Sequence, residues 1–307
     1  MTHDIRSILI YGYGVMGRGV ARTFADSGFE TIIRSSRARE ITDLPAGATV
    51  VDSLPAKTPD LVLELVPENV TVKQAVYADI EAAYPDGNVL IATGTSGLDL
   101  VELGAKLKRP ERFLGMHYFM PADRALVVEV MAGPATPAAA VDAVAAALRR
   151  SGKEPVVLYK PIVGFLVNRL QHAILHEAYY LIEAGVASAA DIDHAARRML
   201  APRMCLNGLI QQKDISGLRI HADAQSSIVP QLFHNRVPNP MLQDMVNRGE
   251  TGLAAGSGFY DWAGCDVEAV RRQASEQLGS LLQFLDDGLG AAAPATQPTS
   301  RDPRRKS

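Results

Sequence analysis

The chain has 307 residues, of which 47% are hydrophobic and 21% charged, and its formal net charge is −3. This composition is typical of a globular protein with one large or two medium domains, and the slight negative charge argues against a nucleic-acid or anionic-membrane surface. No apolar run reaches the roughly 18–20 residues that span a bilayer, and the N-terminus lacks the apolar core of a signal peptide. We therefore expect a cytoplasmic protein, whose two cysteines, Cys205 and Cys265, are free thiols.

A glycine-rich turn follows the first apolar run, at Ile8 to Tyr11, and a helical pattern comes directly after it. A strand, a tight glycine turn and a helix start let the backbone approach a pyrophosphate and direct free N–H groups at it. This context favours a dinucleotide site over an ordinary strand–turn–helix. The residues expected to bind the cofactor here are Gly12, Gly14, Val15, Met16 and Gly17.

Short apolar runs alternate with helical patterns through the first half of the chain. The expected strands are 5–11, 30–33, 49–51, 60–66, 88–93, 113–118, 126–131 and 155–159, and the expected helices are 14–27, 69–84, 98–107 and 137–151. This alternation predicts an α/β fold with a Rossmann-type doubly wound, mostly parallel sheet. Ligands of such sheets bind at the carboxyl ends of the strands, so we look for chemistry just after each strand.

The pattern changes after Lys160, where strand-like runs stop. Helical patterns follow over 162–185, 191–200, 225–233 and 267–285. We expect a dinucleotide-binding domain over 1–160 and an all-helical C-terminal domain over 161–287. Residues 288–307 combine proline, alanine, serine and charge without periodicity, which predicts a disordered tail.

The end of the second strand carries donors where NAD-binding folds usually have an acidic residue for the adenosine ribose. The residues there are Arg34, Ser35, Ser36 and Arg37. Guanidinium and hydroxyl groups suit a 2′-phosphate, because arginine forms charge-assisted, bidentate bonds to phosphate. We therefore predict a preference for NADP, with NAD as the alternative if these side chains are only solvated.

A histidine and a glutamate occur near the ends of two later strands. His117 taken alone is most simply a packed core residue, but Glu129 is a carboxylate inside the apolar run 126–130. A buried acid is costly unless it is paired. If the two strands are neighbours, Glu129 can hold the imidazole tautomer and support its charged form, and His117 becomes a general base for an alcohol.

Asn168 lies in the stretch GFLVNR at the start of the long helical pattern. Its amide is either satisfied by the backbone or a ligand for substrate. His172 and His176 are spaced four residues apart on the same helix, which places both imidazoles on one face. No third ligand accompanies them, so we predict no metal site.

The ordered motifs resemble the L-3-hydroxyacyl-CoA dehydrogenase family over about residues 5 to 262. The motifs are GYGVMG, ELVPEN with Lys73, GTSGL, GMHYFMPA, LVVEV, GKEPVVLYKPIVGFLVNR, GVASAADIDHA and GSGFYDW. The family's catalytic serine, histidine, glutamate and asparagine match Ser96, His117, Glu129 and Asn168. Glu68 and Lys73 match positions that line the cofactor.

This resemblance implies reversible oxidation of a 3-hydroxyacyl compound, either a thioester or a small 3-hydroxy acid, to its 3-keto form. His117 would take the hydroxyl proton, Glu129 would orient His117, and Ser96 and Asn168 would hold the substrate oxygen or the imidazole. The family also implies a homodimer formed by the C-terminal domain.

Three departures from the family pattern narrow the prediction. Ser35 stands where the family has an acid, which agrees with NADP. Met120 replaces the asparagine usual before Pro121, which makes the substrate pocket more apolar. Only residues 38–49 separate the second and third strands, whereas the fatty-acyl enzymes carry a long helical insertion that helps hold coenzyme A. Asp123 and Arg124 either select a polar substrate or form a surface turn.

Two other functions remain as alternatives. A decarboxylating 3-hydroxyacid dehydrogenase also begins with GxGxMG, but it uses a lysine where this chain has Asn168. A non-catalytic, NADP-binding regulatory protein would need no His117–Glu129 pair.

Overall fold

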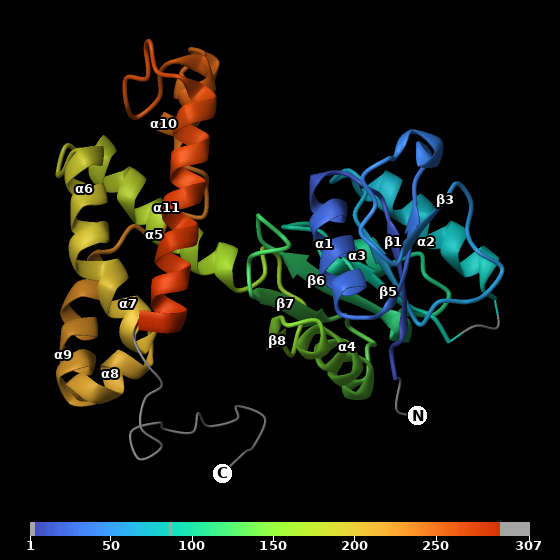
Figure 1. Ribbon diagram of the computed structural model, residues 1–307. Coiled ribbons are helices and arrows are strands. Elements are labelled where there is room, and N and C mark those ends of the chain that lie inside the picture. Colours follow the sequence, from blue (N-terminus) through green and yellow to red (C-terminus); the bar gives the residue numbers. More distant parts are fainter. Residues whose placement is uncertain (1–3, 86–87, 289–307) are drawn as a thin grey trace. The chain divides into compact units, whose positions relative to one another are not determined.

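The computed structural model describes residues 4–85 and 88–288. Contacts divide the chain into two compact units, residues 1–172 and 173–307 (Figure 1). The first unit is an α/β domain and the second is helical, as the sequence predicts. Most of the predicted tail, residues 289–307, lies outside the described residues, and Gly288 is the last residue of helix α11 (Val267–Gly288).

The first unit is built on one eight-stranded sheet with the order β3-β2-β1-β4-β5-β6-β7-β8. Its strands are β1 (Ser7–Tyr11), β2 (Glu30–Arg34), β3 (Ala48–Val51), β4 (Leu61–Glu64), β5 (Leu90–Thr93), β6 (Phe113–Tyr118), β7 (Val127–Ala132) and β8 (Glu154–Leu158). All neighbours pair in parallel except β6 and β7, which are antiparallel. The strand order reverses between β1 and β4, which is where doubly wound sheets bind their ligands.

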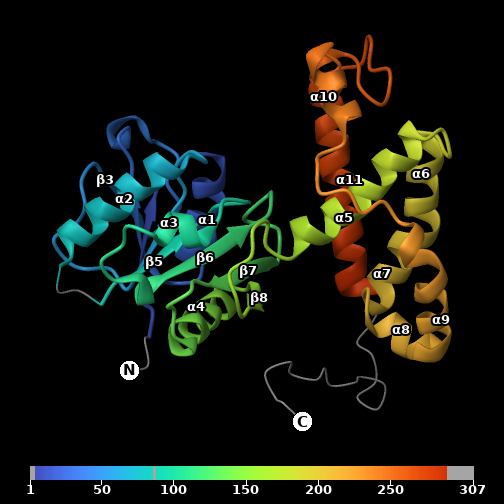
Figure 2. The same cartoon turned by 180° about the vertical axis from the view of Figure 1, so that it is seen from behind.

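Helices cover both faces of the sheet, as Figures 1 and 2 show. They are α1 (Val15–Asp26), α2 (Val70–Ala83), α3 (Leu100–Gly104) and α4 (Ala138–Arg150). Apolar residues of α1 and α4 pack with Ile8, Ile10 and Leu63 on one face. Those of α2 and α3 pack with Leu9 and Val62 on the other. Alternate residues of each strand thus enter opposite cores, which is why the central strands are mostly apolar.

Helix α5 (Val167–Glu183) begins in the first unit and continues into the second. The second unit also contains several shorter helices. These are α6 (Ala189–Ala195), α7 (Ala201–Asn207), α8 (Gln211–Ser216), α9 (Leu218–Ile228) and α10 (Pro240–Asn247), followed by α11. A π-helical turn, Ala196–Leu200, continues α6. Among the described helices of both units, none is long and apolar enough to cross a membrane.

The predicted helices of the second unit differ from the observed ones at their ends. The helix predicted over 162–185 begins only at Val167, because Gly164 (φ 82°) and Phe165 (φ 53°) are left-handed and form a turn before it. The helix predicted over 225–233 is wrong in its bounds: α9 begins at Leu218, and Pro230 lies in a 3₁₀ turn that ends it. Helices α7, α8 and α10 have eight residues or fewer, too short for a clear periodicity.

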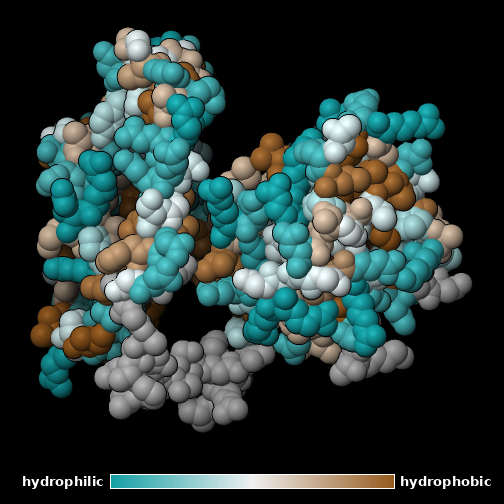
Figure 3. Space-filling model, in the orientation of Figure 1, coloured by the Kyte–Doolittle hydropathy of each residue, from teal (hydrophilic) through white to brown (hydrophobic). Residues whose placement is uncertain are grey.

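The helical unit buries very little of its own apolar surface. Among its described side chains, only Asn239 and Met245 are less than a tenth exposed. Its exposed large apolar residues include Ile210, Ile215, Leu218, Ile220, Val237 and Phe284. Figure 3 shows apolar surface near α8 and α9 on the face in view. An apolar surface of this kind is unusual on a monomeric protein.

Candidate active site

His117 and Glu129 form a buried pair at the antiparallel boundary of the sheet. They lie directly opposite each other in the register of β6 and β7, so their side chains leave the same face. His117 Nδ1 lies 2.8 Å from Glu129 Oε2, and the two side chains are 7% and 0% exposed. The sequence predicts this pair only if the two strands are neighbours, and β6 and β7 are neighbours.

The other oxygen of Glu129 is also satisfied. Oε1 accepts the backbone N–H groups of Leu166 and Val167 at 2.8 and 2.9 Å. Burial alone would raise the pKa of the Glu129 carboxyl, but the His117 bond and the two amides outweigh it and hold the pKa below its ordinary value. A carboxylate that stays ionised fixes the Nδ1–H tautomer of His117 and leaves Nε2 as the ring's proton acceptor.

A cavity of about 400 Å³ in the first unit brings together three of the predicted catalytic residues, Ser96, His117 and Asn168, with Glu129 behind His117. Its lining consists of Met16, Leu65, Val66, Glu68, Gly94, Ser96, His117, Tyr118, Phe119, Met120 and Asn168. Asn168 Nδ2 donates to the Ser96 carbonyl at 2.9 Å, while the Ser96 hydroxyl faces Glu68 Oε1 at 3.3 Å. Ser96 thus bonds both to Asn168 and to Glu68, and Ser96 and Asn168 line the cavity with His117.

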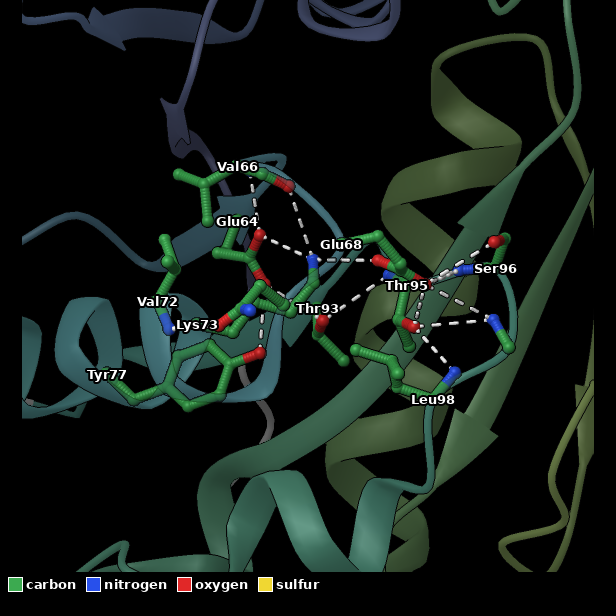
Figure 4. A network of polar contacts seen from close by, with 12 residues as sticks. Glu64, Val66, Glu68, Val72, Lys73, Tyr77, Thr93, Thr95, Ser96 and Leu98 are labelled. Carbon is green, nitrogen blue, oxygen red and sulfur yellow. Dashed lines mark hydrogen bonds and ion pairs between the residues drawn. The ribbon is translucent and has the colours of Figure 1, made fainter.

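Glu68 organises the loop that carries Ser96 (Figure 4). Its Oε1 accepts the Thr95 hydroxyl and the Ser96 N–H, the latter at 2.9 Å. Burial would raise the pKa of the Glu68 carboxyl, but the Thr95 hydrogen bond and the Lys73 charge bring it below its usual value. Glu68 is therefore an anionic acceptor in the wall of the cavity.

Lys73 is almost completely buried, with a side chain that is 1% exposed. Its ammonium lies 2.8 Å from Glu64 Oε1 and 3.3 Å from Glu68 Oε2. Glu64 also accepts the Val66 N–H and the hydroxyls of Tyr77 and Thr93, all between 2.8 and 2.9 Å. Burial beside Glu64 raises the pKa of the Tyr77 hydroxyl, which keeps that hydroxyl a donor. Lys73 thus bridges two carboxylates beneath the cavity.

The glycine turn has the geometry that a pyrophosphate requires. Gly12 has φ of 113°, and a Cβ there would lie 2.8 Å from the Leu65 carbonyl oxygen. A Cβ on Gly17 would overlap the Gly12 carbonyl, whereas the space around Gly14 is open. Gly14 is the N-cap of α1, with no side-chain cap and no acid in the first turn. The N–H groups at this helix start suit an anionic ligand.

The end of β2 lies beside this turn, because the Gly12 N–H donates to the Arg34 carbonyl at 3.0 Å. The Arg34 guanidinium stacks over the Tyr11 ring, 4.6 Å from its centroid. The Ser35 hydroxyl accepts the Arg37 N–H at 3.1 Å. Within the described residues neither arginine pairs with a carboxylate, and residues 34–37 include no acid.

Three residues near the site, Glu64, Phe119 and Phe165, are not among the predicted site residues. Glu64 is a carboxylate in an apolar run, as Glu129 is, and this pattern is a signal of a paired, buried acid. Phe119 and Phe165 lie 4.6 and 5.0 Å from the His117 ring, centroid to centroid, and no pattern marks an aromatic residue as a neighbour of a histidine. Asp123 pairs with Arg22 on the surface and is not part of the cavity lining.

His172 and His176 do not form part of a metal cluster. Among the residues that the structure describes, no group of three or more His, Cys, Asp or Glu side chains could hold a metal ion. His176 Nε2 instead lies 2.7 Å from the Asn235 carbonyl.

Two family models match most of the chain. The model of the 3-hydroxyacyl-CoA dehydrogenase NAD-binding domain matches residues 44–162, and the model of that family's C-terminal domain matches residues 164–262. A probable 3-hydroxybutyryl-CoA dehydrogenase of Bacillus subtilis is 29% identical over 291 residues, covering 84% of this chain and 98% of its own.

A second relative is similar along almost its whole length. The 5-formyl-3-hydroxy-2-methylpyridine 4-carboxylate 5-dehydrogenase of Mesorhizobium japonicum is 28% identical over 308 residues, covering 92% of this chain and 99% of its own. A crystal structure of an enzyme with this activity, described as an NAD⁺-dependent dismutase, has a TM-score of 0.83 at 27% identity and covers 92% and 99% of the two chains. For a 3-hydroxyacyl-CoA dehydrogenase from Archaeoglobus fulgidus the TM-score is 0.67 at 30% identity, covering 91% and 99%.

Proposed function

The chain belongs to the 3-hydroxyacyl-CoA dehydrogenase family of oxidoreductases, and we propose that it interconverts a small 3-hydroxyacyl compound and its 3-keto form with NADP, using His117 as general base. The observation that carries this proposal is the buried His117–Glu129 pair, 2.8 Å apart, whose imidazole lines a cavity together with Ser96 and Asn168.

In the direction of oxidation, His117 takes the proton of the substrate hydroxyl. Because Nδ1 donates to Glu129, Nε2 is the basic nitrogen, and the carboxylate stabilises the imidazolium that forms. The nicotinamide cofactor supplies the hydride acceptor. Ser96 and Asn168 position the substrate oxygen, and in the reverse direction His117 returns the proton to it.

The choice of NADP rests on the end of β2. The 2′-phosphate of NADP would lie among Ser35, Ser36 and Arg37, beside the stacked Arg34, and these donors suit a dianion better than a ribose hydroxyl. Glu68 would accept a ribose hydroxyl from the wall of the cavity. Lys73 would hold Glu68 rather than contact the cofactor, because it is buried beneath that carboxylate.

The substrate is proposed to be a small acid rather than a long acyl-CoA. Only one 3₁₀ turn, Ala38–Glu40, separates β2 from β3, so the chain has no helical insertion there to hold coenzyme A. The relative with the higher TM-score of the two structures above acts, by its name, on a pyridine carboxylate. The apolar side chains of Met16, Leu65 and Met120 in the cavity wall suit a compact carbon skeleton.

A homodimer formed by the helical unit is part of the proposal. In this unit only two described residues are less than a tenth exposed, and large apolar residues such as Ile210 and Ile220 are exposed, so apolar surface is available to a partner. A second copy of the same unit would cover this surface with matching apolar side chains.

The test is a screen of NADPH and NADH, each with acetoacetyl-CoA and with small free 3-keto acids, on the wild type and on His117→Ala. We expect NADPH-dependent reduction of a free acid by the wild type, and loss of turnover with NADPH binding retained in His117→Ala. Unchanged turnover in His117→Ala would refute the mechanism. NADPH binding without turnover of any substrate would favour a regulatory protein.

A further inference from the structure

The turn before α5 contains a strained aromatic residue next to the catalytic pair. Phe165 is the one non-glycine residue with positive φ (53°) among those described, and its side chain is 0% exposed. Residues other than glycine adopt this conformation only where the surrounding structure fixes it, and such residues cluster at active sites. The Phe165 ring centroid lies 5.0 Å from that of His117.

The packing that fixes Phe165 comes from β6. A Cβ added to Gly115 would lie 2.9 Å from Phe165 Cζ, so the glycine makes room for the ring two residues before His117. Phe119, two residues after His117, contacts the same imidazole at 4.6 Å between centroids. The imidazole is therefore held by two aromatic rings as well as by Glu129.

The two residues after Phe165 direct their backbone N–H groups at Glu129. The Leu166 carbonyl accepts the Leu170 N–H at 3.0 Å, so Leu166 is the N-cap of α5 and Val167 its first residue. These N–H groups have no acceptor within the helix. Oε1 of Glu129 is the acceptor that they lack, although Glu129 lies on β7, 37 residues before Leu166, while Oε2 faces His117.

We propose that the turn Gly164–Val167 is the positioning element of the His117–Glu129 pair. The left-handed backbone at Phe165 directs the Leu166 and Val167 amides to Glu129, and the Phe165 ring sets the plane of the imidazole. None of these groups touches the reacting atoms, so they act through the pair. This inference rests on the proposed role of His117 as the base.

The amides favour the ionised form of Glu129, so their removal makes proton uptake by the pair easier. The carboxylate and the imidazole share one hydrogen bond, so the loss of a donor to the anion favours proton uptake by the pair as a whole. The other ionisable residues lining the cavity are Glu68, whose pKa is held low by its own hydrogen bonds, and Tyr118, whose pKa is raised by burial. Neither donates to Glu129.

Val167→Pro tests this directly, because proline removes one N–H donor at the first position of a helix, where its ring is well tolerated. We expect the apparent titration midpoint of the pair, followed on the His117 ring by NMR, to rise by about one pH unit, a tenfold change in proton affinity. We expect kcat to fall about tenfold while the Kd for NADPH is unchanged.

Two controls separate the amide from other effects. Val167→Ala shortens the side chain but keeps the N–H group, so the midpoint should stay at its wild-type value. Ala189→Pro places proline at the same first position of α6, in the other unit, where the Ser188 side chain accepts the Asp191 N–H. It should change neither the midpoint nor kcat.

Phe165→Gly distinguishes the effect of the ring from that of the backbone. It also tests the proposal if Val167→Pro does not fold. Glycine adopts φ of 53° freely, so the amides keep their direction and the midpoint should stay within a few tenths of a unit, while kcat falls. A folded Val167→Pro with the wild-type midpoint would overturn the proposal, and so would a Phe165→Gly enzyme with the wild-type kcat. The NMR titration needs no substrate, so an absence of turnover would count against the proposed function alone.

Discussion

Glu129 on β7 lies directly opposite His117 on β6, and the two side chains meet at 2.8 Å between Oε2 and Nδ1. The β6–β7 pair is antiparallel, so residues in register leave the same face of the sheet and come close together. The antiparallel return of β7 after β6 thus brings an acid and an imidazole from 12 residues apart into one hydrogen bond.

Replacing Glu129 by glutamine should lower kcat about 100-fold, in the range by which general bases accelerate proton transfer. A glutamine side chain can accept a hydrogen bond through only one of its two terminal atoms, whereas Glu129 accepts on both. Either His117 or the Leu166 amide therefore faces an NH₂ group. The measurement is kcat with a 3-keto substrate, with NADPH affinity as the control. A kcat within twofold of wild type would show that Glu129 does not support the base.

Replacing Lys73 by methionine should destabilise the protein by about 3–5 kcal/mol, the usual effect of removing one partner from a buried ion pair. Glu64 is 0% exposed and would lose its cation. The measurement is the midpoint of thermal unfolding without cofactor. A Lys73→Met protein that is as stable as wild type but binds NADPH weakly would instead make Lys73 a cofactor ligand.

The double variant Glu64→Gln/Lys73→Met is the matched control for that experiment. It removes both charges, so no uncompensated carboxylate remains, and we expect it to recover part of the lost stability. A double variant less stable than Lys73→Met would contradict the view that the buried Glu64 charge causes the loss.

The sequence could predict the sheet and the main catalytic pair because both follow from local pattern. Apolar strands alternate with helices, and Glu129 is visible as an acid in an apolar run. The same signal occurs at Glu64, but its partner Lys73 lies on a helix nine residues on. The family resemblance places Lys73 beside the cofactor, and only tertiary packing shows that its side chain is buried.

The role of Phe165 could not be predicted for a different reason. Its position depends on the space left by Gly115 on β6. It also depends on a left-handed φ, which the sequence indicates only where the residue is glycine. The short helices α7 and α8 escaped prediction because seven and six residues are too few to show a helical period.

Ser35→Asp should reverse the cofactor preference. An aspartate would accept the ribose hydroxyl of NAD and repel the 2′-phosphate of NADP, so the ratio of the two Kd values should change about 10–100-fold. Fluorescence titration with NADH and NADPH measures both constants. Ser35→Asn, which has the same size without the charge, should change the ratio much less. A wild-type enzyme that already prefers NADH would contradict the prediction before any substitution is made.

Asp60 should make stability depend on pH. Its Oδ2 accepts the N–H groups of Arg6 and Ser7 and the Ser7 hydroxyl, at 2.8–2.9 Å. Burial would raise the pKa of the Asp60 carboxyl, but these bonds bring it below the ordinary 3.8. The folded pKa is depressed, so the stabilisation is complete above pH 3.8 and is lost as the pH falls through the folded value.

The measurement is the thermal midpoint of wild type and Asp60→Asn from pH 7 to pH 3. The difference between the two proteins should be largest at pH 7 and should shrink below about pH 4. A difference that does not vary with pH would show that the Asp60 charge is not stabilised by folding.

Ile220→Asp should convert the proposed dimer to a monomer. Ile220 is 71% exposed on α9, and Leu218 on the same helix is 60% exposed. An aspartate placed in an apolar interface between two copies would be buried without a cation to pair with. Size-exclusion chromatography with light scattering should give twice 33.0 kDa for wild type and half of that for the variant. Asp223→Ala, on the same helix, removes an exposed charge and should leave the dimer intact. A monomeric wild type would refute the dimer, and a dimeric Ile220→Asp would place its interface elsewhere on the helical unit.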